Sequence, residues 1–334
     1  MAGCNSSKMA LQEPAAPPAY SIIYIIHGDA NYLYHDAEGN ALKADEEVLK
    51  EAKTVARQAK NGEVFIFHQK PEKKILWLLP KKDRRFLHYR NGTLVRDERY
   101  SPQSNNNSFI AEAQFYNRYS KISTQNGSKK VLLYFGHEIP YKGGHGYNFS
   151  RSEAFFNLNI FVEGITSFLP NKNARFDLTV LSTCNNGTPS IVHALTPHSR
   201  YVLASPQNLH LSHFDTGQLS TLLETSGTTA KQIADRLAEQ TYQRLSSFLQ
   251  TVITLSVYDT DVTGSYLPSL NRSYQGYLSD RTDIQPIRDN IDCATLPFFD
   301  TDKYDLGLDV WYKPPRFGQK ENAAVYSGWG CNVK

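Results

Sequence analysis

Two short polar segments each follow an apolar run that is typical of a buried β-strand. His137 and Gly136 follow the run 131–135, and Cys184 follows the run 178–181 after Ser182 and Thr183. A cysteine thiolate is a strong nucleophile, and a nearby imidazole is a common base for it. If the two runs are neighbouring parallel strands, both polar segments lie at the same edge of one sheet. The sequence therefore predicts a Cys184–His137 nucleophile–base pair.

The residues after Cys184 favour a reactive thiol. Thr188 and Pro189 are typical of an N-cap and a first helical position, so a helix is expected to begin there. Its positive end would point toward the Cys184 turn and stabilise a thiolate, and backbone N–H groups of that turn could hold an oxyanion. The alternative is a buried structural cysteine without chemistry.

Apolar runs alternate with amphipathic segments along most of the chain. Strands are expected at Tyr20–His27, 63–68, 75–79, 131–135, 178–181 and 201–204, and longer helices at 44–59, 109–122, 152–168 and 229–249. Asn91-Gly92 between two β-forming segments predicts a hairpin. This alternation predicts an α/β fold with a mostly parallel sheet and helices on both faces.

Several motifs resemble those of one peptidase group. The segment 134–137 (Tyr-Phe-Gly-His) resembles the histidine block of the clostripain, gingipain, legumain and caspase group, and 182–187 (Ser-Thr-Cys-Asn-Asn-Gly) resembles its nucleophile block. The segments 22–31 and 201–206 are similar to its opening strand and to the strand after the nucleophile helix. The separation of 47 positions between His137 and Cys184 (184 − 137) also suits the group. The resemblance, over about residues 20–260, implies a caspase-like fold with a small β-hairpin excursion.

The resemblance also implies a function. It predicts a clostripain-like cysteine endopeptidase that cleaves peptides or proteins through a thioester on Cys184, with His137 as general acid/base and no metal or cofactor. The oxyanion hole would use the backbone N–H groups of Cys184 and Glu138. The group usually has Gly where Glu138 stands, and Asp where Ser182 stands, so we expect a weakened preference for a basic P1 residue. Asp215 could supply the missing charge.

Other residues left alternatives open. His145, in a Gly-rich loop, is the rival base. His27 is expected to be structural or pocket-lining, and His193 to be a packed histidine. Self-cleavage is a hypothesis at Arg151, with Lys142 as the other basic residue in that loop. Asp300, Asp302 and Asp305 lack the glycine of a calcium loop and favour a surface turn. The runner-up function is an inactive member of this fold that acts as a surface binding lipoprotein. The third hypothesis is an unrelated α/β hydrolase or nucleotide-binding protein. It ranks last because the sequence contains neither a G-x-S-x-G elbow nor a phosphate-binding glycine loop.

The first residues predict a lipid anchor. Cys4 follows Met-Ala-Gly as in a cleaved bacterial lipoprotein signal, and a polar, Ala/Pro-rich stretch runs to about Pro18. We expect residues 1–18 to be a flexible leader and 19–334 a single peptidase domain in the bacterial cell envelope, lipid-attached through Cys4. A monomer is expected.

Charge and cysteine content exclude some classes. The net charge of +3, from 36 basic and 33 acidic residues, is too balanced to indicate nucleic-acid binding. No apolar run approaches the roughly 18 residues of a membrane-spanning helix. A Cys293–Cys331 disulfide is possible, but spacing alone does not decide it.

Overall fold

The computed structural model describes residues 17–28, 33–35, 39–70, 74–75, 79–80, 83–101, 108–122, 127–141, 144, 155–209, 213–279, 293–297, 299–300, 303–316 and 325–333. Its centre is a set of parallel strands that lie in the order β11 (Ser199–Ala204), β10 (Phe176–Ser182), β9 (Lys129–Phe135), β1 (Tyr20–His27) and β4 (Gly62–Gln69). Antiparallel strands complete a nine-stranded sheet: β12 (Ile253–Asp259) and β13 (Leu308–Lys313) beyond β11, and β7 (Arg84–Arg90) and β8 (Thr93–Tyr100) beyond β4. The mostly parallel sheet predicted by the alternating pattern is confirmed.

Strand β1 shows why this sheet needs helices on both faces. All eight of its residues are buried. Ile23 and Ile25 enter one hydrophobic core, whereas Ile22, Tyr24 and Ile26 enter the other. Because successive side chains of a strand point to opposite faces, an uninterrupted apolar strand must be covered twice.

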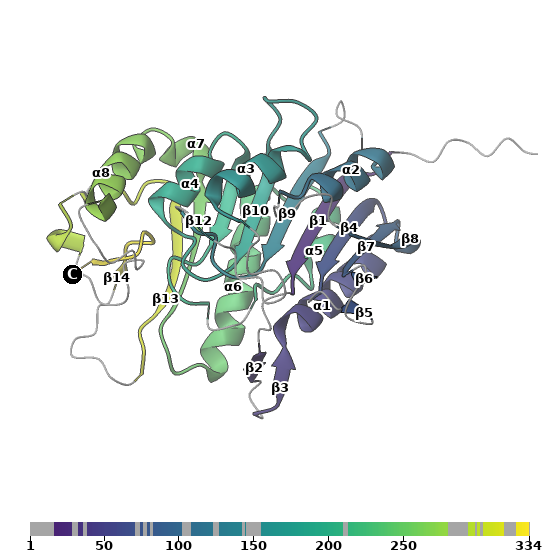
Figure 1. The fold of residues 1–334 in the computed structure, drawn as a ribbon. Helices are drawn as coiled ribbons and strands as arrows, with labels where there is room; N and C mark the ends of the chain where they lie inside the picture. Colours follow the sequence, from purple (N-terminus) through teal and green to yellow (C-terminus); the bar gives the residue numbers. More distant parts are fainter. Residues whose placement is uncertain are drawn as a thin grey trace, which may run out of the picture.

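Helices supply both covers (Figure 1). One core includes side chains of α2 (Ile110–Tyr119), α3 (Leu158–Thr166), α4 (Pro189–Leu195) and α8 (Leu267–Ser279). The other includes side chains of α1 (Ala44–Gln58), α5 (Leu219–Glu224) and α6 (Ala230–Phe248). A short helix, α7 (Thr260–Thr263), follows β12.

Capping residues set where several helices begin. Thr188 accepts a hydrogen bond from the backbone N–H of Ile191 and opens α4, as predicted. Thr229 and Gln232 form a capping box at the start of α6. Asn157 accepts from the N–H of Ile160, so α3 begins at Leu158 and not at 152, where the apolar pattern had placed it.

One predicted strand is wrong, and the predicted hairpin belongs to the main sheet. The single strand expected at 75–79 is wrong, because β5 (Lys74–Ile75) and β6 (Leu79–Pro80) are two short strands that pair antiparallel. The predicted hairpin is present, with Asn91 and Gly92 both at positive φ. Its first strand, β7, pairs with β4, so the hairpin extends the main sheet. Short antiparallel pairs also join β2 (Leu33–His35) to β3 (Ala41–Lys43) and β14 (Val325–Tyr326) to β15 (Asn332–Val333).

The C-terminal part adds two strands to one edge of the main sheet and contains a disulfide. The pattern analysis did not predict β12 and β13, which extend the sheet beyond β11. Cys293, in the short helix η1 (Cys293–Thr295), forms a disulfide with Cys331, so the pair that spacing left open is bonded. Both cysteines are buried in the core that contains α4 and α8. Disulfides of this kind persist in oxidising compartments.

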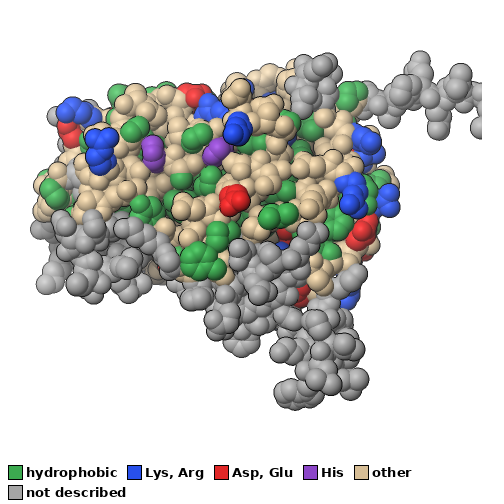
Figure 2. All heavy atoms as spheres, turned by 45° about the horizontal axis from the view of Figure 1, so that its top comes forward, with side chains coloured by type: hydrophobic (Ala, Val, Ile, Leu, Met, Phe, Trp, Pro, Cys, Tyr) green, Lys and Arg blue, Asp and Glu red, His purple; other side chains and the backbone are tan. Residues whose placement is uncertain are grey.

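The surface is mixed in character. On the face drawn in Figure 2, acidic, basic and apolar side chains of the described residues are interspersed. Among the described residues, no helix combines the length and the apolar character needed to cross a bilayer.

Two adjacent arginines allow a matched test of burial. Arg84 contacts Glu112 at 2.6 Å with both side chains 4% exposed, and Arg85 contacts Asp97 at 2.6 Å with side chains 38% and 39% exposed. Removing one partner of a buried pair leaves a desolvated charge, which costs about 3–5 kcal/mol, whereas an exposed pair contributes about 0–1 kcal/mol. Glu112→Ala should therefore lower the free energy of unfolding far more than Asp97→Ala, measured by guanidinium titration. Equal losses would contradict this assignment.

Candidate active site

The strands that precede His137 and Cys184 are direct neighbours in the sheet. β9 and β10 are parallel, and their last paired residues are Phe135 and Ser182, which are 47 positions apart (182 − 135). His137 and Cys184 each follow two residues later, at the carboxyl ends of these strands. Neighbouring strands lie about 4.8 Å apart. The two predicted catalytic residues therefore occupy matching places on adjacent segments.

The same offset continues beyond both residues. The side-chain amide of Asn185 donates to the carboxylate of Glu138 at 2.8 Å, and the backbone N–H of Ile139 donates to Asn186 Oδ1 at 3.0 Å; each contact joins residues 47 apart. The segments after β9 and β10 thus run side by side in the register of the sheet. His137 and Cys184 lie between contacts that hold this register on both sides.

The loop that carries Cys184 is hydrogen-bonded to the segment after β11. The N–H of Leu209 donates to Cys184 Sγ at 3.3 Å, and the N–H of Asn185 donates to the carbonyl of Gln207 at 2.9 Å. Asn185 has a φ of 56°, a left-handed conformation that asparagine tolerates better than most residues. A hydrogen-bond donor at the sulfur stabilises negative charge there.

Gly187 is required by the packing of this loop. A Cβ at this position would lie 2.5 Å from the hydroxyl of Tyr258 and 2.7 Å from the backbone nitrogen of Pro206. The N–H of Gly187 donates to Ser205 at 2.9 Å, which ties the loop to the end of β11. The glycine in the nucleophile motif therefore serves close backbone packing.

Glu138 is tied to the nucleophile loop. Its carboxylate accepts the hydrogen bond from Asn185, so the acid that replaces the expected glycine bridges the two loops. Around the predicted oxyanion donors, the N–H groups of Gly136 and Ile139 already donate to Ser182 O and Asn186 Oδ1. The assignment of the Cys184 and Glu138 N–H groups to the oxyanion stays a prediction.

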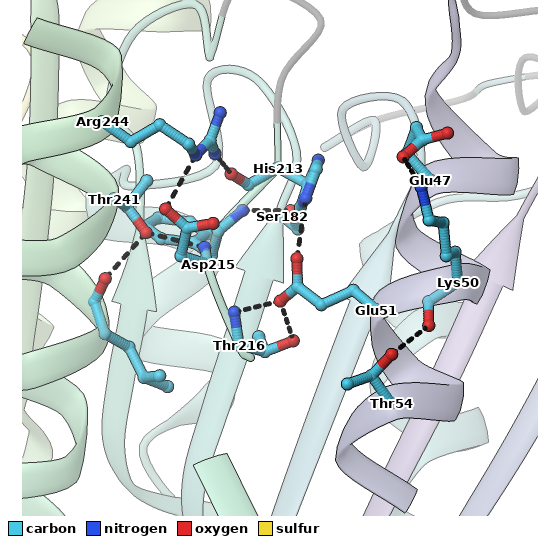
Figure 3. Close-up of polar contacts among 12 residues, drawn as sticks. Glu47, Lys50, Glu51, Thr54, Ser182, His213, Asp215, Thr216, Thr241 and Arg244 are labelled. Carbon is cyan, nitrogen blue, oxygen red and sulfur yellow. Dashed lines mark hydrogen bonds and ion pairs between the residues drawn. The ribbon is translucent and has the colours of Figure 1, made fainter. Parts of the chain in front are cut away.

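The two residues predicted to contact substrate are held by internal bonds (Figure 3). Ser182 is buried, and its hydroxyl accepts from the N–H of Phe214 at 3.0 Å. The carboxylate of Asp215 accepts from Arg244 Nε at 2.7 Å, and its backbone N–H donates to Thr241 Oγ1 at 2.8 Å. Arg244 therefore balances the negative charge of Asp215.

A polar network extends from Asp215 to helix α1 (Figure 3). His213 lies 3.0 Å from the carboxylate of Glu51, and both the N–H and the hydroxyl of Thr216 donate to the other oxygen of Glu51. Burial by itself would raise the pKa of Glu51, but the hydrogen bonds from His213 and Thr216 outweigh it and lower the pKa below its ordinary value. The network joins α1, α6 and the segment 213–216.

This network also holds the one group of metal-ligand type found among the described residues. The ligand atoms of Glu51, His213 and Asp215 lie within 4.8 Å of one another. Arg244 pairs with Asp215 there, and its positive charge would repel a metal cation. The donors are thus used by internal hydrogen bonds and an ion pair, and we assign no metal to them.

The remaining predicted residues fall elsewhere. His27 is buried at the end of β1, as expected for a structural histidine. His193 lies on α4 and is half-buried, and this burial lowers its pKa. Cys4, Lys142, His145, Arg151 and Asp302 lie outside the described residues.

Sequence reasoning missed the residues that hold the site together. The two asparagines after Cys184 were treated only as part of a motif, and Glu51, His213 and Arg244 were not singled out. For the asparagines a signal existed, since the offset of 47 pairs Asn185 with Glu138 and Asn186 with Ile139. For Glu51 and Arg244 there was none, because no strand pairing predicted from the sequence places them beside His213, Thr216 or Asp215.

Comparisons by sequence found no relative. No model of a protein family matches the chain, and no curated protein matches it. Comparison of structures, however, finds a secreted C11 cysteine protease from Bacteroides thetaiotaomicron, named iotapain, at 12% identity, with 80% of this chain and 72% of that chain covered and a TM-score of 0.51. A secreted C11 cysteine protease from the same organism, in complex with an irreversible peptide inhibitor, matches at 12% identity over 78% of this chain and 71% of that chain, with a TM-score of 0.50.

At this identity the likeness concerns the fold. It covers most of both chains. The caspase-like α/β fold predicted from the motifs is therefore confirmed: the chain has the fold of the C11, clostripain-like cysteine proteases.

Proposed function

We propose that this chain is a clostripain-like cysteine endopeptidase with Cys184 as nucleophile and His137 as general acid/base. The observation that supports it most is the constant offset of 47 residues between the segments after β9 and β10, within which Cys184 and His137 occupy matching places. The likeness of the fold to C11 cysteine proteases adds to it.

The proposed reaction uses residues of this chain alone. His137 takes the proton of the Cys184 thiol, and the thiolate attacks the carbonyl carbon of the scissile bond. The N–H groups of Cys184 and Glu138 would stabilise the resulting oxyanion. His137 returns the proton to the leaving amine, which leaves a thioester on Cys184. His137 then takes a proton from the water that hydrolyses the thioester and passes it to the departing thiolate, which restores the Cys184 thiol.

The proposed substrate and location follow from the same comparison. One matched structure holds a peptide inhibitor, and both matched proteases are described as secreted, so we propose a peptide or protein substrate and an extracellular or envelope location. The buried Cys293–Cys331 disulfide agrees with an oxidising compartment. Attachment to the membrane through a lipid on Cys4 and a monomeric state are part of this proposal.

An inactive, binding member of the fold is the alternative. It is favoured by the bond between Glu138 and Asn185, because this places a carboxylate where the group usually has glycine. The first experiment below separates the two.

Cys184 should react with thiol-directed peptide probes faster than Cys293 or Cys331. Cys293 and Cys331 are bonded to each other, and among the described cysteines Cys184 is the one that is not in a disulfide. We expect Cys184→Ala to abolish hydrolysis of a peptide library while circular dichroism and the Tm stay unchanged. Turnover that persists in Cys184→Ala would refute the peptidase assignment. A wild-type chain that neither cleaves peptides nor takes up the probe would favour the binding protein.

Replacement of His137 should remove most of the catalytic rate. Because a positioned general acid/base contributes about 10²–10⁴-fold, His137→Ala should lower kcat by that factor. His193→Ala is the control on the helix after the nucleophile, and we expect less than a threefold change. His145→Ala tests the rival base, and a loss of kcat as large as that of His137→Ala would reverse the choice.

The preference for a basic P1 residue should be weak. A desolvated charge-assisted hydrogen bond contributes about 1.5–3 kcal/mol, or roughly ten- to a hundredfold in kcat/KM. Ser182 offers no charge, and Arg244 already balances Asp215. We expect matched Arg, Lys, Gln and Ala peptides to differ by less than about tenfold, and Asp215→Asn to leave their ratios unchanged. Such ratios do not depend on the fraction of folded enzyme. A strong Arg preference that disappears in Asp215→Asn would show that Asp215 recognises the P1 side chain.

A further inference from the structure

We propose that Asn186 is the positioning residue that sets the separation of His137 and Cys184. This role rests on the proposed function, because it concerns the same nucleophile–base pair. Asn186 follows Cys184 by two residues, and its side chain reaches across to the segment that carries His137.

The side chain of Asn186 bonds to both segments at once. Its Oδ1 accepts from the backbone N–H of Ile139 at 3.0 Å and from the hydroxyl of Thr183. Its Nδ2 lies 3.4 Å from the carbonyl of Ile139, to which it donates. One amide therefore binds the residue two positions after His137 and the residue directly before Cys184.

These bonds extend the pairing of the sheet beyond the ends of its strands. On the sheet side of His137, the N–H of Gly136 lies 3.5 Å from the carbonyl of Ser182. On the other side, the amide of Asn186 takes the place of a neighbouring peptide group and bonds to both the N–H and the C=O of Ile139. His137 is therefore fixed at both ends of the short segment 136–139 against the segment that carries Cys184.

Burial gives this contact its weight. Asn186 is 2% exposed, so water does not readily replace its bonds, and loss of the amide would leave the N–H and C=O of Ile139 without these partners. The neighbouring bond from Asn185 to Glu138 is only partly buried and holds a flexible side chain rather than the backbone. Asn186 is thus the contact that restrains the path of the main chain beside His137.

Small displacements of a base have large effects on rate. A misplacement of about 1 Å can lower a rate about 10²-fold even when substrate binding is unaffected. If Asn186 positions His137, its removal should lower kcat much more than it changes KM. It should also change how the reactivity of Cys184 depends on pH, because the thiolate is stabilised by a nearby imidazolium.

The test compares Asn186→Ala with Asn271→Ala. Asn271 is also buried and accepts a hydroxyl hydrogen bond, from Ser190 at 2.8 Å, but it lies on α8 and joins no segment of the site to another. We expect both variants to lose thermal stability. Asn186→Ala should also lower kcat about 10²-fold with KM changed less than threefold, and the pH profile of Cys184 alkylation by iodoacetamide should move toward that of an ordinary thiol. Asn271→Ala should keep the wild-type kcat and profile.

A second pair of variants tests one hydrogen bond of the Asn186 amide and applies even if Asn186→Ala does not fold. Thr183→Val removes the hydroxyl that donates to Asn186, whereas Thr183→Ser keeps it. We expect Thr183→Val to lower kcat and to move the alkylation profile in the same direction as Asn186→Ala does. Thr183→Ser should keep the wild-type kcat and profile.

The outcomes separate this role from the proposed function. Equal kcat values for Asn186→Ala and Asn271→Ala at equal loss of Tm, or an unchanged alkylation profile, would overturn the positioning role alone. A wild-type protein that does not cleave peptides, and whose Cys184 alkylates like an ordinary thiol, would overturn the proposed function and the positioning role together.

Discussion

The parallel pairing of β9 with β10 is the interaction on which the candidate site depends. It lies within the buried centre of the sheet, where a shift of register by one residue would turn every side chain of a strand to the other face. The two hydrophobic cores oppose such a shift, because each receives alternate residues of these strands. The relative position of His137 and Cys184 is therefore set by the packing of the whole domain, and the side chains of the loops refine it.

Polar contacts beyond the strand ends carry this order into the loops. Asn186 binds the backbone after β9, Leu209 donates to the sulfur of Cys184, and Phe214 donates to Ser182. The backbone N–H groups of Ile139, Leu209 and Phe214 would otherwise lose their hydrogen bonds on burial. The same contacts therefore satisfy the backbone of the loops and position the site. The segment after β11 thus supports the nucleophile loop from one side, and the segment after β9 supports it from the other.

Charge near the site is balanced within the protein. Arg244 pairs with Asp215, and His213 and Thr216 bind Glu51, so α6, α1 and the segment between them are held by one network (Figure 3). Such a network costs desolvation and gives little net stability, but it limits which arrangements the loop can adopt. Asp215 follows Phe214, the residue whose N–H donates to Ser182, and its negative charge is already paired with Arg244. This balance distinguishes the site from one built around a free carboxylate.

The sequence by itself determined the strands β1, β9 and β10, the start of α4 and the strand-end positions of His137 and Cys184, because these depend on local patterns of apolar residues, caps and turns. It also allowed the C11-like fold to be predicted from short motifs in order. Only the tertiary structure decided the joining of the β7–β8 hairpin to β4, the addition of β12 and β13, the Cys293–Cys331 bond and the partners of Asp215 and Asn186. Each of these depends on contacts between separate segments of the chain, and such contacts are set by the packing of the whole molecule, which no local pattern contains.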